Sequence, residues 1–121
     1  MMKKIMIVDD SLLIRLNLKK IFQTNGYEVV AEAANGEEAC EKFEKYKPDL
    51  TTMDITMPVM DGIGALKHIC TNNINAKIIM ISALGQEQKV VEALNNGASH
   101  FILKPFAEAD ILKNVEAVLN S

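Results

Sequence analysis

The chain has 121 residues, of which 49% are hydrophobic and 24% are charged, and its net charge at pH 7 is −3. This length is typical of one domain, the composition excludes a disordered chain, and the acidic balance argues against duplex DNA or an anionic membrane as the main partner. The two cysteines, Cys40 and Cys70, are too few for a disulfide framework, and no apolar run is long enough for a signal peptide or a membrane span. We therefore expect a cytoplasmic protein with reduced cysteines.

Five short apolar runs alternate with helical patterns along the chain. The runs cover residues 5–8, 29–31, 50–53, 78–81 and 101–103, and their short length and β-branched residues predict strands. Their apolarity is continuous rather than alternating. We therefore expect both faces of each strand to be buried, as in a parallel sheet.

Apolar residues recur at helical spacing between these strands. In chain order the stripes are Ile14, Leu18, Ile21 and Phe22; Ala39, Phe43 and Tyr46; Ile63, Leu66 and Cys70; Val90, Val91 and Leu94; and Ile111, Val115, Val118 and Leu119. Asn35 with Glu38 resembles a capping box, and Asp61 is placed to cap the helix that follows it. Five βα units predict an α/β fold, in which a doubly wound parallel sheet carries helices on both faces.

Polar side chains follow four of the five strands at the edge where such sheets bind ligands. The residues at these strand ends are Asp9 and Asp10, Asp54, Ser82 and Lys104, whereas the second strand offers little and fits an outer position. Two carboxylates about 4 Å apart repel by about 4 kcal/mol at an effective dielectric of 20, so the acidic cluster favours a hard cation such as Mg²⁺. Ser82 and Lys104 suit phosphoryl oxygens, and an aspartate beside Mg²⁺ can act as a nucleophile that forms an acyl phosphate.

These strand ends belong to segments that together resemble the receiver domain of bacterial response regulators. The segments are VDD at 8–10, MDITMPVMDG at 53–62, SA at 82–83 and KPF at 104–106. The similarity spans essentially the whole chain in order and spacing, and within the family the chain most resembles the stand-alone chemotaxis regulators. It implies a flavodoxin-like fold with strand order 2-1-3-4-5, and residues 1–121 as one receiver domain without an output domain.

The resemblance assigns roles to the acidic residues. Asp54 matches the aspartate that a histidine kinase phosphorylates. Asp9 and Asp10 match the acidic pair that positions Mg²⁺, and Thr56 matches the residue whose backbone carbonyl binds the metal.

The resemblance also assigns a switch. Ser82 matches the hydroxyl residue that turns towards the phosphoryl group, Lys104 matches the lysine that pairs with it, and the bond between Lys104 and Pro105 matches one that is usually cis. Phe101 stands at the aromatic switch position, where chemotaxis relatives often carry Tyr. Phenylalanine has no hydroxyl, so only a change of rotamer is open to it.

The function implied is a phosphorylation-activated switch that catalyses only its own phosphotransfer and its own slow dephosphorylation. Slow decay is expected because Thr56 and the apolar Leu84 stand where fast-cycling relatives carry polar, water-placing side chains. The implied partners are a chemotaxis-type histidine kinase, a downstream protein such as the flagellar motor switch, and a resetting phosphatase. The expected protein is a monomer that contacts neither nucleic acid nor membrane.

Other functions fit parts of this pattern. A phosphorelay intermediate, or an isolated receiver of a DNA-binding regulator, would carry the same site. A Mg²⁺-dependent phosphohydrolase needs a second acid two residues after its nucleophile, where this chain has Thr56. A flavodoxin-like electron carrier needs a phosphate-binding loop after the first strand, where Asp9 and Asp10 would repel phosphate.

Overall fold

The computed structural model describes all 121 residues, which form a five-stranded parallel sheet with a helix after each strand. The strands are β1 (Lys4–Val8), β2 (Glu28–Ala33), β3 (Leu50–Asp54), β4 (Ile78–Ser82) and β5 (His100–Leu103). The helices are α1 (Leu12–Thr24), α2 (Gly36–Tyr46), α3 (Gly62–Asn72), α4 (Glu87–Asn95) and α5 (Glu108–Leu119). The strands lie in the order β2-β1-β3-β4-β5, all neighbours are parallel, and the expected α/β fold is confirmed.

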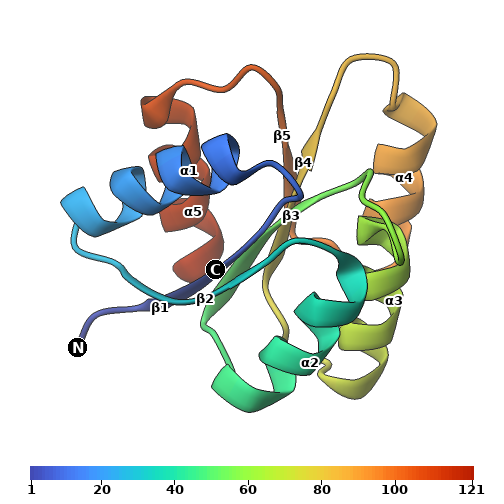
Figure 1. The fold of residues 1–121 in the computed structure, drawn as a ribbon, viewed down its shortest axis with the longest axis horizontal. Coiled ribbons are helices and arrows are strands. Elements are labelled where there is room, and N and C mark those ends of the chain that lie inside the picture. The colour runs from blue at the N-terminus through green and yellow to red at the C-terminus, as the bar shows by residue number, and fades with distance from the viewer.

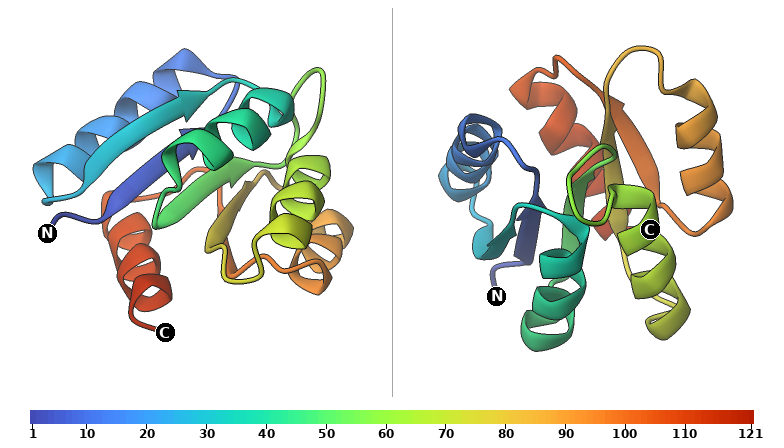
Figure 2. Two further views of the ribbon diagram at one scale, coloured as in Figure 1. Left: turned by 90° about the horizontal axis from the view of Figure 1, so that it is seen from below. Right: turned by 45° about the vertical axis from the view of Figure 1, so that its right-hand side comes forward.

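Two helical layers sandwich the sheet. Figures 1 and 2 show α1 and α5 on one face and α2, α3 and α4 on the other. Alternate residues of β1 enter two separate cores, with Ile5 and Ile7 packed on the α1–α5 side and Met6 and Val8 on the opposite side. Every residue of β3 is buried. The inner strands, which have continuous apolar runs, are therefore buried on both faces, as expected.

That expectation is wrong for the two edge strands. Ala33 is the only buried residue of β2, and Ile102 is the only one of β5. Phe101 and Leu103 are 38% and 45% exposed. An edge strand has a neighbouring strand on one side only, and the helices cover its outer part incompletely.

The stripe predicted for the fourth helix is also wrong in part. Val90 is buried as expected, but Val91 and Leu94 are 56% and 41% exposed, and Ala93 is the second residue that α4 buries. The helix lies at the edge of its layer, so it packs a narrow face against the sheet. Its remaining apolar residues face solvent on the same side as Phe101 and Leu103 of β5.

Three of the five helices begin at a side-chain cap. Ser11, Asn35 and Asp61 each accept a hydrogen bond from the backbone N–H three residues further on, which confirms the predicted caps at Asn35 and Asp61. Gln86 and Ala107 precede α4 and α5 and make no such bond.

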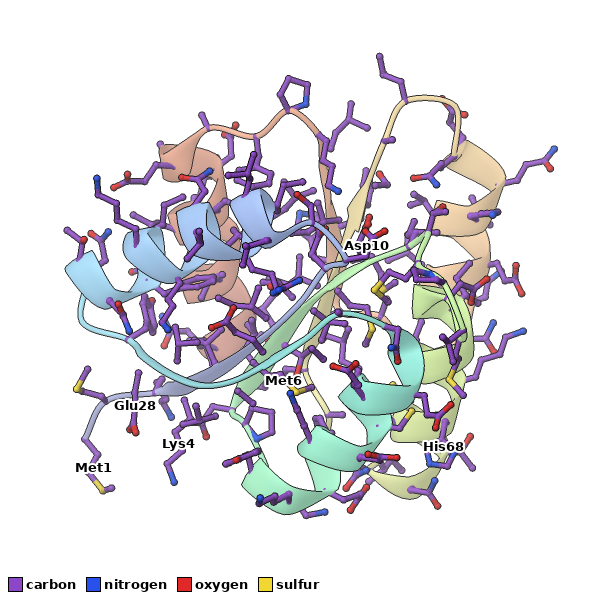
Figure 3. All side chains as sticks on the ribbon, in the orientation of Figure 1. Met1, Lys4, Met6, Asp10, Glu28 and His68 are labelled. Carbon is purple, nitrogen blue, oxygen red and sulfur yellow. The ribbon has the colours of Figure 1, made fainter.

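Figure 3 shows how the side chains divide between interior and surface. Met6 on β1 is fully buried, Asp10 is exposed beyond the end of the same strand, and His68 is exposed on α3. None of the helices combines enough length with enough apolar character to cross a membrane.

Candidate functional site

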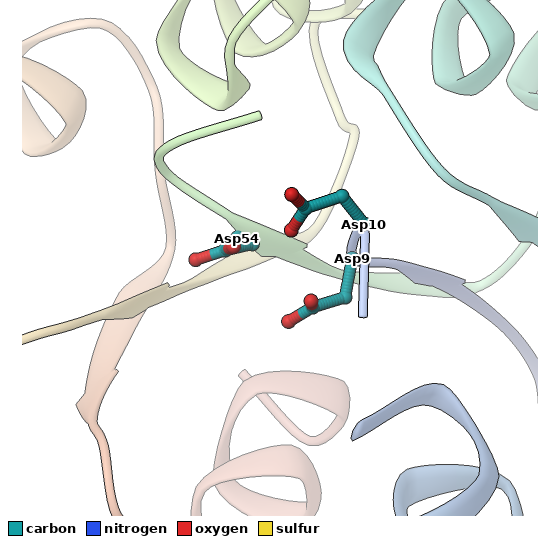
Figure 4. Close-up of side chains that lie close together, drawn as sticks. All are labelled: Asp9, Asp10 and Asp54. Atoms are coloured by element: carbon teal, nitrogen blue, oxygen red, sulfur yellow. The ribbon is translucent and has the colours of Figure 1, made fainter. Parts of the chain in front are cut away.

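Three aspartates meet where β1 and β3 end (Figure 4). β1 and β3 pair in parallel, so Asp9 and Asp10 beyond β1 come level with Asp54 at the end of β3. One carboxylate oxygen from each residue lies within 4.8 Å of the others. Asp9 and Asp54 are 1% and 7% exposed, whereas Asp10 is open to solvent. The predicted acidic cluster is therefore brought together, with one side facing water.

Lys104 provides the positive charge of this cluster. Its Nζ lies 3.2 Å from Asp9 Oδ2 and 3.3 Å from Asp54 Oδ1. The Lys104–Pro105 peptide bond that follows β5 is cis, as the resemblance implied. One ammonium cannot balance three carboxylates, so two negative charges remain when all the groups are ionised.

The charges and the burial shift the pKa of two groups. Burial and the neighbouring Asp9 carboxylate raise the pKa of Asp54 to about 6, although Lys104 opposes the shift. Burial alone would lower the pKa of the Lys104 ammonium, but Asp54 and Asp9 outweigh burial and raise it. Asp54 is thus largely ionised at neutral pH. It lies beside two further carboxylates, those of Asp9 and Asp10, and Lys104 is the one cation that pairs with it.

The cluster has the chemistry of a magnesium site. Mg²⁺ prefers carboxylate and carbonyl oxygens, keeps several waters, and is commonly held by one or two protein carboxylates. Asp9, Asp10 and Asp54 offer such oxygens, their uncompensated charge matches a divalent ion, and the exposed side at Asp10 leaves room for water. Thr56 lies two residues beyond Asp54 on the loop that follows β3.

Ser82 and Phe101 line a neighbouring cavity. Ser82 ends β4, is 1% exposed, and has a buried hydroxyl without a hydrogen-bond partner. The cavity has a volume of about 340 Å³ and is lined mostly by apolar side chains, among them Val91, Leu94 and Leu103. Phe101 lies at this cavity, which is lined by residues of α4 and β5. Pro105 follows Lys104 in the loop after β5 and is exposed.

Backbone packing fixes the acidic residues. The N–H of Gly62 donates to the Ile55 carbonyl at 2.7 Å, and a Cβ at position 62 would lie 2.0 Å from the Asp54 carbonyl oxygen. The Ser11 N–H donates to Asp9 Oδ1 at 2.9 Å. The start of α3 therefore closes on the end of β3 only because residue 62 is glycine.

The family profile described as "response regulator receiver domain" matches residues 5–116. The chain belongs to this family. It is 50% identical over 120 residues to the chemotaxis protein CheY of Bacillus subtilis, which covers 99% of this chain and 100% of that protein. The CheY of Thermotoga maritima is 49% identical over 116 residues, covering 96% of this chain and 97% of that protein.

A solved structure shares the fold closely. A chain in the crystal structure of the CheX-CheY-BeF3-Mg+2 complex from Borrelia burgdorferi superposes with a TM-score of 0.92 and is 44% identical. The match covers 96% of this chain and 88% of that chain. This chain is thus a receiver domain of the two-component type, and its curated relatives include chemotaxis regulators of matching length.

Two residues of this receiver domain make contacts near the site that were not predicted from the sequence. Arg15 on α1 donates from Nη1 to the backbone carbonyl of Asp9 at 2.7 Å, and Gln86 bridges the loops that follow β3 and β4. Neither belongs to a recognisable motif. Arg15 contacts Asp9, which is 6 positions away in the sequence, and Gln86 contacts Thr56, which is 30 positions away. Only the folded chain brings the residues of each pair together.

Proposed function

We propose that this receiver domain is a phosphorylation-activated switch in which Asp54 accepts a phosphoryl group from a histidine kinase. The observation that carries the proposal is the place of Asp54. Its carboxylate is nearly buried, shares one site with Asp9 and Asp10, and lies 3.3 Å from the only ammonium of the cluster.

The transfer uses one carboxylate oxygen of Asp54 as the nucleophile. This oxygen attacks phosphorus, the P–N bond to the kinase histidine breaks, and an acyl phosphate remains on the aspartate. Asp9, Asp10, Asp54 and the backbone carbonyl of Thr56 would hold Mg²⁺, which when bound supplies positive charge against the carboxylates and phosphoryl oxygens. Lys104 already forms ion pairs with Asp9 and Asp54, so its ammonium would lie beside the phosphoryl group once Asp54 is phosphorylated.

Ser82 would then read the new charge. Its hydroxyl is buried without a partner, so a phosphoryl oxygen within reach is a strong acceptor for it. A charge-assisted hydrogen bond of this kind contributes roughly 1.5–3 kcal/mol, enough to shift a minor conformation markedly. Ser82 and Phe101 line the same cavity, so a turn of Ser82 towards Asp54 leaves space into which the Phe101 ring can swing.

The output surface proposed here is the side of α4 and β5. Val91, Leu94, Phe101 and Leu103 expose apolar surface there, next to the cavity that the switch would change. The full-length similarity to chemotaxis regulators supports a downstream protein of the flagellar motor switch as the partner and a chemotaxis-type kinase as the donor.

Slow decay of the acyl phosphate is part of the proposal. Thr56 Oγ1 accepts a hydrogen bond from Gln86 Nε2, and Leu84 is an apolar side chain, 78% exposed, on the loop beyond Ser82. The apolar Leu84 and the contact between Gln86 and Thr56 support slow decay, so rapid resetting would require a phosphatase.

The test is phosphorylation by acetyl phosphate with Mg²⁺, followed by intact-mass measurement. Wild type should gain one phosphoryl group, and the gain should vanish when EDTA removes the metal. Asp54→Asn should gain none, whereas Asp110→Asn, which alters an exposed aspartate of α5, should match wild type. Labelling of Asp54→Asn at the wild-type rate would place the acceptor elsewhere.

A further inference from the structure

Gln86 ties together the two loops that flank Asp54. Its Oε1 accepts a hydrogen bond from the Ala83 backbone N–H at 2.7 Å, and its Nε2 donates to Thr56 Oγ1 at 2.7 Å. Thr56 lies on the loop after β3, and Ala83 lies on the loop after β4. One partly buried side chain therefore spans the opening between the two strand ends.

The position of Gln86 at the start of α4 makes this use of its side chain notable. Ser11, Asn35 and Asp61 use the same position in their helices to accept a hydrogen bond from the first turn. Gln86 makes no such bond, so the first turn of α4 lacks the roughly 1 kcal/mol that a good cap contributes. The hydrogen-bonding capacity of Gln86 is directed instead at the loops beside the acidic cluster.

The Ala83 N–H is a donor that a phosphoryl group on Asp54 could use. The sheet register pairs Asp54 with Ile81, so Ala83 stands two residues further along and level with Thr56. It directly follows Ser82, whose buried hydroxyl has no hydrogen-bond partner. A phosphoryl group carries three acceptor oxygens, and Gln86 competes with them because it already occupies the Ala83 N–H.

We propose that Gln86 is a positioning residue that stabilises the resting arrangement of the two loops and releases the Ala83 N–H when Asp54 is phosphorylated. This inference rests on the function proposed above. Gln86 makes both of its bonds in the resting state and loses at least the one to Ala83 in the active state. Its removal should therefore favour the active state.

The test measures the affinity of the protein for beryllofluoride, a mimic of a phosphoryl group on a carboxylate, with Mg²⁺ present. Gln86→Ala should bind about threefold to tenfold more tightly, which corresponds to the net free energy of one hydrogen bond. Gln86→Glu should bind less tightly than wild type, because a charged acceptor holds the Ala83 N–H more strongly and repels the anion. Gln88→Ala, which removes an exposed glutamine from the same helix, is the matched control and should equal wild type.

A second readout separates positioning from a purely structural role. The amide resonance of Ala83 should move in unliganded Gln86→Ala, whereas beryllofluoride should move the side-chain NH₂ resonances of Gln86 in wild type. Unchanged or weaker binding by Gln86→Ala would overturn the proposed role of Gln86 while leaving the phosphorylation site intact. Failure of wild type to bind beryllofluoride, with Asp54→Asn behaving identically, would overturn the proposed function itself.

Discussion

The end of β3 and the region of α4 and β5 are built in opposite ways. Every residue of β3 is buried, and α3 begins at a side-chain cap and a glycine that touches the strand. α4 has no side-chain cap and buries only Val90 and Ala93, and β5 buries only Ile102. Tight packing holds groups at fixed distances, whereas sparse packing leaves conformations close in free energy. The domain thus has a rigid half, the end of β3 with α3, which carries Asp54, and a loose half, α4 with β5, which carries the proposed output surface.

The largest expected difference in the free energy of unfolding comes from substituting one glycine in the rigid half and one in the loose half. Gly62→Ala places a Cβ 2.0 Å from the Asp54 carbonyl oxygen, so α3 must shift, and the free energy of unfolding should fall by about 3–5 kcal/mol. Gly85→Ala in the β4–α4 loop meets nothing within 4 Å and should lose about 1 kcal/mol, because its φ of 86° disfavours a side chain. Urea denaturation measures both. Equal losses would remove the contrast.

Truncation of one leucine on each side sharpens the same contrast. Leu66 on α3 is fully buried, so Leu66→Ala should lower the free energy of unfolding by about 3 kcal/mol. Leu94 on α4 is 41% exposed, so Leu94→Ala should change it by less than about 0.5 kcal/mol. The pair is measured by denaturation in the same buffer. A loss at Leu94 close to that at Leu66 would mean that α4 packs as firmly as α3.

The rigid half should also contribute a pH dependence when the metal is removed. The pKa of Asp54 is raised in the fold to about 6 from an ordinary value of 3.8, so between these values the folded protein binds more protons than the unfolded chain. The free energy of unfolding should therefore fall as pH rises through this interval and level off above it. Asp54→Asn removes this slope and should stabilise the protein at pH 7 by up to about 3 kcal/mol. Thermal unfolding in EDTA between pH 4 and 8 checks this, and a wild-type curve parallel to that of Asp54→Asn would contradict it.

The sequence was sufficient to predict that Asp9, Asp54 and Lys104 lie together, because the fold is parallel. Once Asp9, Asp54 and Lys104 are recognised at the ends of their strands, parallel pairing alone brings them to one edge of the sheet. The inner strands and the helix caps follow from equally local signals, such as the polar caps Asn35 and Asp61.

Apart from the edge strand β2, the errors lie in the loose half, and they have a physical cause. Helical spacing places Val91 and Leu94 on one stripe with Val90, but which part of a stripe is buried depends on the neighbouring elements, and α4 lies at an edge. Phe101 and Leu103 are exposed for the same reason. Gln86 could not be identified because its partner Thr56 is 30 residues away and neither residue type signals the contact.

The most direct test of the central claim is a comparison of amide NMR spectra with and without beryllofluoride and Mg²⁺. Besides the neighbours of Asp54, the amides of the β4–α4 loop, α4 and β5 should shift, whereas those of α2 should stay in place. This result would show that charge on Asp54 is read at the loose half. Shifts confined to the loops around Asp54, or shifts of equal size in α2 and α4, would contradict the account.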